Sequence, residues 1–106
     1  MKTHQQIDAR SLALARAVVA RIDADPRHEG LEKARHVCRR WAAGRPEACH
    51  REWLEILERP WSEVRELLLE DSETGRRRRQ SSPFCGILTP AERWGIYRDF
   101  QVHATE

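Results

Sequence analysis

The C-terminal part of the chain constrains the fold most, because it combines a loop, a helix start and a row of aromatic residues. Thr89 has the side chain of an N-cap, Pro90 suits the first helical position, and Glu92 stands where a capping box requires a carboxylate. The proline and the glycine between residues 81 and 88 resist regular structure. The sequence therefore predicts an irregular loop over 81–88 and a helix over 89–101.

Three aromatic residues, Trp94, Tyr97 and Phe100, recur at every third position of this predicted helix. They share one side of it, so we expect them to dock the helix against the first two helices and to complete the core. The alternative is an exposed row that binds a partner. Arg93 falls between their directions and is expected to lie over an aromatic face. The loop before the helix is expected to place Phe84 in an apolar pocket.

Apolar residues recur at helical spacing along the rest of the chain. The predicted helices cover about 6–23, 26–43 and 46–58, and a fourth begins at residue 60. Asp25 is expected to cap the second helix and Pro26 to occupy its first position. Between residues 71 and 80, a glycine and four arginines leave helix and turn as open alternatives. These patterns predict one all-α domain, residues 1–106, built as a compact bundle of about five helices.

The composition is that of an amphipathic globular protein, with 40% hydrophobic and 34% charged residues. The longest apolar run, Ala17–Ala20, is far too short to span a membrane. The first eight residues lack the apolar middle of a secretory signal, which favours a cytoplasmic location. The net charge of +2 is too small to indicate nucleic-acid binding by itself.

Three cysteines, Cys38, Cys49 and Cys85, make an odd number in a chain expected in a reducing compartment, so free thiols are predicted. Together with His36 and His50, the first two have the ligand types of a zinc site. His36 and Cys38 are two positions apart and Cys49 and His50 are adjacent, so on helices the side chains of each pair diverge. We therefore expect no metal and no cofactor.

The sharpest charge feature is the run of Arg76, Arg77, Arg78 and Arg79. Guanidinium groups bind carboxylates and phosphates through paired hydrogen bonds, so this run could contact an acidic protein or a nucleic acid. Together with Phe84 it forms the candidate partner-binding group, because interfaces use aromatic and arginine anchors. The alternative is a solvated turn without a partner.

The sequence contains none of the catalytic motifs that spacing alone reveals, such as a Gly-rich phosphate loop, a nucleophile elbow or a metalloprotease helix. Glu63, Glu66 and Glu70 line one side of the predicted fourth helix, where carboxylates are ordinarily solvated. The same charges argue against this helix as a DNA recognition helix, because they would repel phosphates. The chain is therefore predicted not to be an enzyme.

Residues 79–94 read Arg-Gln-Ser-Ser-Pro-Phe-Cys-Gly-Ile-Leu-Thr-Pro-Ala-Glu-Arg-Trp. This stretch resembles the ending of a group of small helical bacterial proteins, in which the positions equivalent to 85, 87, 89 and 91 vary. The chain from Ser11 to Trp41 resembles the same group in pattern only. Cys85 stands where the group has a small residue, and residues 75–78 are unusually basic. The resemblance implies an antitoxin-like member of a two-gene toxin–antitoxin module, and it brings no catalytic or binding residues with it.

These observations support three hypotheses. The first is a non-enzymatic, antitoxin-like protein that binds a toxin and masks its active site or substrate channel. The second is a nucleic-acid-binding regulator that uses the arginine run and the basic side of the second helix, with an affinity that falls steeply as salt rises. The third is a self-associating structural protein whose terminal aromatic residues pack across a symmetric homodimer.

Overall fold

A computed structural model describes the backbone of residues 4–44 and 46–105 and the side chains of residues 8–44 and 46–99. Within these residues the chain forms six α-helices and no strand. The helices are α1 (His4–Asp23), α2 (Glu29–Ala43), α3 (Ala48–Leu57), α4 (Trp61–Leu68), α5 (Glu73–Gln80) and α6 (Pro90–Thr105). The predicted all-α fold is confirmed, with six helices in place of about five.

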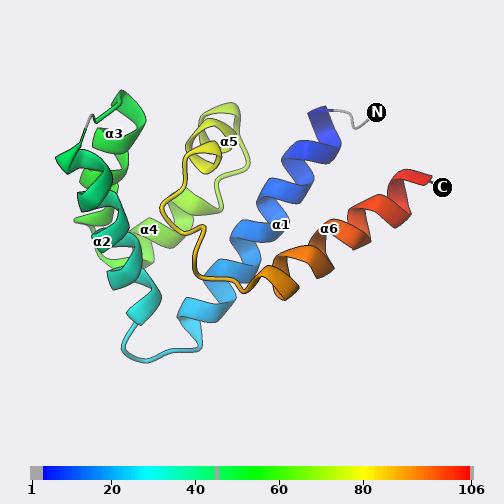
Figure 1. Cartoon of the computed structure of the whole chain (residues 1–106), viewed down its shortest axis with the longest axis horizontal. Helices are drawn as coiled ribbons and strands as arrows, with labels where there is room; N and C mark the ends of the chain where they lie inside the picture. Colours follow the sequence, from blue (N-terminus) through cyan, green and yellow to red (C-terminus); the bar gives the residue numbers. More distant parts are fainter. Residues whose placement is uncertain (1–3, 45, 106) are drawn as a thin grey trace.

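The first helix holds the molecule together, since α1 contacts α2, α5 and α6 (Figure 1). In addition, α2 packs against α3 and α4 against α5, while α6 runs antiparallel to α1 along its side (Figure 1). The molecule is elongated, with extents of 43 × 31 × 23 Å. In the part of the chain that is described, no helix combines the length and the apolar character needed to cross a membrane.

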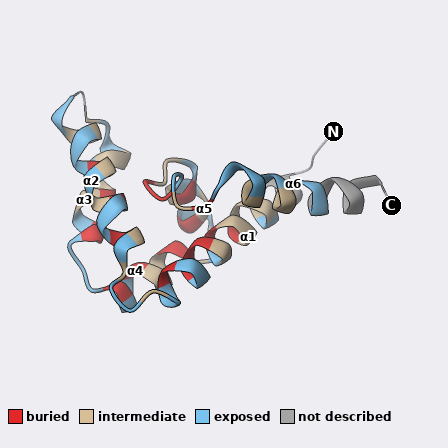
Figure 2. Ribbon diagram, turned by 60° about the horizontal axis from the view of Figure 1, so that its bottom comes forward, coloured by how far each residue is buried: buried red, intermediate tan, exposed pale blue. Residues whose placement is uncertain are grey.

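The hydrophobic core lies between α1, α2, α3 and α4. Its buried residues come from these helices and from the loop before α6 (Figure 2). Two tryptophans and one phenylalanine form its aromatic centre. The ring of Phe84 lies edge-on to Trp53 at 5.9 Å and tilted to Trp61 at 6.4 Å. Phe84 comes from the irregular loop before α6 and is 2% exposed, which confirms the prediction that this loop delivers it into an apolar pocket.

The start of α2 differs from the prediction, because Pro26 lies before the helix and Asp25 is not its N-cap residue. Its carboxylate accepts hydrogen bonds from the backbone N–H groups of Arg27 at 3.1 Å and Glu29 at 2.8 Å. His28 then adopts a left-handed conformation with φ of 50°, and α2 begins one residue later. The aspartate therefore stabilises a turn that competes with helix at this point.

The sequence left helix and turn open between residues 71 and 80, and most of this stretch forms α5. Ser72 caps it, because its hydroxyl oxygen accepts a hydrogen bond from the N–H of Gly75 at 3.1 Å. A Cβ atom on Gly75 would lie 2.0 Å from the carbonyl oxygen of Glu70, so this position requires glycine. At α6 the predicted capping box is confirmed, since Thr89 and Glu92 exchange hydrogen bonds of 3.1 and 3.0 Å.

Candidate functional site

Three members of the arginine run join α5 to its neighbours. Arg76 pairs with Asp8 of α1 at 3.1 Å, and Arg77 and Arg78 pair with Glu52 of α3 at 3.1 and 2.9 Å. The hydrogen bonds from Arg78 and then Arg77 hold the pKa of Glu52 below its ordinary value. Arg77 is more than half exposed, whereas Arg78 is largely buried. These arginines therefore bind carboxylates of the chain itself.

Arg79 is a buried structural residue. It is 8% exposed, and it donates to the hydroxyl oxygen of Ser11 at 3.0 Å and to the carbonyl oxygens of Leu68 and Glu70 at 3.1 and 2.7 Å. Burial lowers the pKa of its guanidinium. Arg79 and Phe84 belong to the candidate partner-binding group of the sequence analysis, but both lie in the interior and are not accessible to a partner.

The aromatic row of α6 is not a core element in the way the sequence suggested. Trp94 is 57% exposed, and its ring lies edge-on to that of Tyr97 at 6.4 Å. Instead α6 packs against the core through Ile96, which lies about 200° from Trp94 around the helix axis. The guanidinium of Arg10 of α1 lies over the Tyr97 ring, 4.8 Å from its centre. The sequence had predicted Arg93 over an aromatic face. Phe100 lies outside the described side chains.

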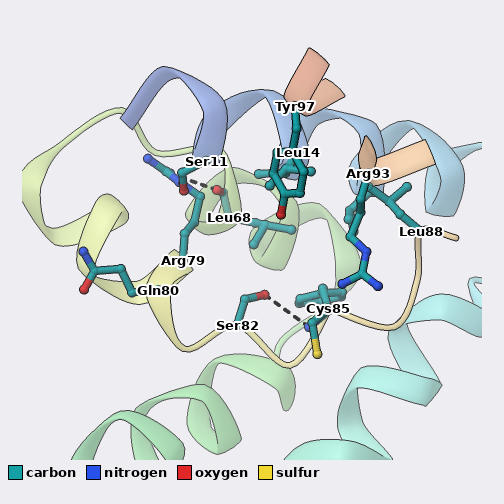
Figure 3. Close-up of a pocket in the computed structure, with 13 residues that line it drawn as sticks. Ser11, Leu14, Leu68, Arg79, Gln80, Ser82, Cys85, Leu88, Arg93 and Tyr97 are labelled. Carbon is teal, nitrogen blue, oxygen red and sulfur yellow. Dashed lines mark hydrogen bonds between the residues drawn. The ribbon is translucent and has the colours of Figure 1, made fainter. Parts of the chain in front are cut away.

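Beside this aromatic pair, a cleft of about 190 Å³ opens between α1, the α5–α6 loop and α6 (Figure 3). We call it the α1–α6 cleft. It is lined by Ser11, Leu14, Ala15, Val18, Leu68, Arg79, Gln80, Ser82, Phe84, Cys85, Leu88, Arg93 and Tyr97. Arg93 and Tyr97 reach from α6 toward the loop that carries Cys85 (Figure 3). Most of the wall is apolar, and its only charged members are two arginines.

The hydroxyl groups of the cleft serve the local structure. Ser11 accepts a hydrogen bond from the buried Arg79, and Ser82 accepts one from the backbone N–H of Phe84 at 3.1 Å. These two hydrogen bonds organise the cleft wall. The arrangement is therefore suited to holding an apolar group beside a positive charge.

The residues considered for zinc lie apart from this cleft. Cys38 is buried and its thiol donates to the carbonyl oxygen of His50 at 3.5 Å, while burial raises the pKa of that thiol. Cys49 is partly buried, and His36 is exposed on α2. Among the described residues, no group of three or more His, Cys, Asp or Glu side chains is arranged to hold a metal ion.

The sequence predictions missed the cleft because its walls come from segments far apart in the chain. One usable signal was the spacing of Arg93 and Tyr97, which are four positions apart and so share a face of α6. A second was Leu14, which the helical pattern assigns to the apolar side of α1 although it is only partly buried.

No protein-family model, curated protein or solved structure matches the chain.

Proposed function

We propose that this chain is a non-enzymatic, antitoxin-like protein of the bacterial cytoplasm that binds and masks a partner toxin. The binding surface, which we call the docking face, consists of Arg10, Arg93, Trp94, Tyr97 and the α1–α6 cleft. The observation that carries the proposal is the 57% exposure of Trp94, whose ring lies edge-on to that of Tyr97 in the wall of the cleft. Tryptophan, tyrosine and arginine are the residue types that dominate binding energy at protein interfaces.

The docking face replaces the arginine run as the proposed contact. The run is engaged within the fold, and only Arg77 among its paired members has a side chain more than half exposed. The nature of the partner is supported by the resemblance of residues 79–94 to antitoxin-like proteins. That stretch supplies both the loop that forms one wall of the cleft and the start of α6.

The test is co-purification with the protein encoded by the adjacent gene. We expect a stable complex with the wild-type chain and a loss of at least about tenfold in affinity for Trp94→Ala. The matched control is Arg40→Ala, an exposed position on α2 outside the docking face, which should bind normally. No complex with the wild-type chain, or a complex that Trp94→Ala leaves unchanged, would contradict the proposal.

A second candidate function, self-association, is favoured by the same observation. An exposed tryptophan that contacts the cleft wall through Tyr97 can equally pack against a second copy across a two-fold axis. Light scattering of the purified chain distinguishes the two, because a homodimer through this face should dissociate in Trp94→Ala.

A further inference from the structure

We propose that the partner segment on the docking face is acidic and amphipathic, with one large apolar side chain flanked by carboxylates. The apolar side chain fills the α1–α6 cleft, and the carboxylates pair with Arg93 and Arg10. This inference rests on the proposed function and specifies the chemistry of the partner at that site.

The size of the cleft favours a side chain over a free small molecule. Its volume of about 190 Å³ falls below the roughly 300–1,000 Å³ of typical small-molecule sites. Leu14, Val18 and Leu88 contribute aliphatic wall, and Phe84 contributes an aromatic surface. A single apolar side chain presented by a protein segment fits such a space and removes its surface from water.

The positive charge at the cleft determines which groups of the partner can lie beside that apolar side chain. Neither Arg10 nor Arg93 forms an ion pair with a described residue, whereas the nearby Arg21 pairs with Glu92. Glu92 is also held by the N–H of Thr89, so it is committed to capping α6. The positive charge at the cleft is therefore balanced by no carboxylate of its wall, and a partner carboxylate would complement it.

Arg10 and Arg93 both lie next to Tyr97. Arg93 and Tyr97 are one helical turn apart on α6, and Arg10 lies over the Tyr97 ring at 4.8 Å. Stacking on the ring holds the Arg10 guanidinium in place and leaves its edge available for hydrogen bonds. A guanidinium that is already positioned loses less entropy when it binds a carboxylate.

The same features disfavour a nucleic acid at this face. Phosphate backbones are bound by many cationic contacts, each of which adds to the salt dependence of affinity. Here Arg93 lines an apolar cleft that phosphate oxygens cannot fill, and Arg10 lies over the ring of Tyr97 in its wall. An acidic protein segment satisfies the charge and the apolar surface at once.

The experiment measures the affinity of the full-length chain for the product of the adjacent gene after charge reversal. We expect Arg93→Glu to weaken binding by about tenfold or more, and Arg93→Lys by less, because lysine keeps the charge but loses the paired hydrogen bonds. The matched control is Arg16→Glu, the same change at an exposed position of α1 outside the docking face, which should stay within about twofold of wild type. Melting temperatures should match among the three variants, which separates lost binding from lost folding.

A second readout identifies the partner segment. Hydrogen exchange of the complex should protect a stretch of the partner in which a large apolar residue has Asp or Glu within one helical turn on either side. A protected stretch that is basic or uncharged overturns the inference, as does equal weakening by Arg93→Glu and Arg16→Glu. If Trp94→Ala disrupts the complex and Arg93→Glu does not, the proposed function stands and the acidic segment is wrong. If the wild-type chain forms no complex, both are wrong.

Discussion

The guanidinium of Arg79 donates a hydrogen bond of 3.1 Å to the carbonyl oxygen of Leu68, the last residue of α4. The same nitrogen donates at 2.7 Å to the carbonyl oxygen of Glu70, in the turn that follows. The last turn of a helix leaves its carbonyl groups without partners inside the helix. Arg79 therefore supplies hydrogen-bond donors to the carbonyl groups at the end of α4 and links α4 to α5.

We expect Arg79→Ala to destabilise the fold by about 1–3 kcal/mol, because it leaves buried carbonyl groups without donors. Arg77→Ala is the matched control within the same run. Its side chain is 58% exposed, so the lost ion pair should cost no more than about 1 kcal/mol. Urea denaturation followed by circular dichroism measures both, and equal losses would contradict the structural role of Arg79.

The tryptophans give a second contrast between core and surface. Trp53 is 1% exposed and donates its indole N–H to the carbonyl oxygen of Arg78 at 3.0 Å, so Trp53→Ala should cost about 3–5 kcal/mol. Trp94→Ala removes a side chain that is 57% exposed and should cost less than about 1 kcal/mol. A large loss of stability in Trp94→Ala would show that α6 depends on this residue for packing.

The local signals in the sequence were reliable where one short segment decides the structure. The capping box of Thr89 and Glu92 and the loop that buries Phe84 both follow from neighbouring residues. The exposure of Trp94 and the burial of Arg79 could not be predicted in this way. Helical spacing shows which residues share a face, but the element that covers the face is set by contacts between distant segments.

The pairing of the arginine run illustrates the same limit. Arg76 meets Asp8 across most of the chain length, and Arg77 and Arg78 meet Glu52 of another helix. Nothing in the run itself distinguishes these internal ion pairs from contacts with an acidic partner. The structure shows that the run is paired within the fold, whereas Trp94 of the docking face is exposed.

Two glycines should respond in opposite directions to alanine. A Cβ atom on Gly95, inside α6, would meet no heavy atom within 4 Å, so Gly95→Ala should stabilise the fold by about 0.5–1 kcal/mol. At Gly75 the new Cβ would lie 2.0 Å from the carbonyl oxygen of Glu70, so Gly75→Ala should destabilise the fold by forcing α5 away from that turn. Thermal melts of the two variants test this, and a stabilising Gly75→Ala would contradict the observed start of α5.

The stability of the fold should depend on the ionisation of Glu52. Hydrogen bonds from Arg78 and Arg77 hold the pKa of Glu52 below its ordinary value in the folded protein. A carboxyl whose folded pKa is lowered adds stability above its unfolded pKa, and this stability is lost as pH falls through the folded value. The contribution of Glu52 should therefore be fully present at neutral pH and fall away below about pH 4.

Glu52→Gln should be less stable than wild type at pH 7, and the difference should shrink as the pH is lowered toward about 2. Free energies of unfolding from urea denaturation at a series of pH values measure this convergence. The control is Glu66→Gln, at an exposed position of α4, whose difference from wild type should stay small throughout. Parallel pH profiles for wild type and Glu52→Gln would mean that the ion pairs of Glu52 with Arg77 and Arg78 do not stabilise the fold.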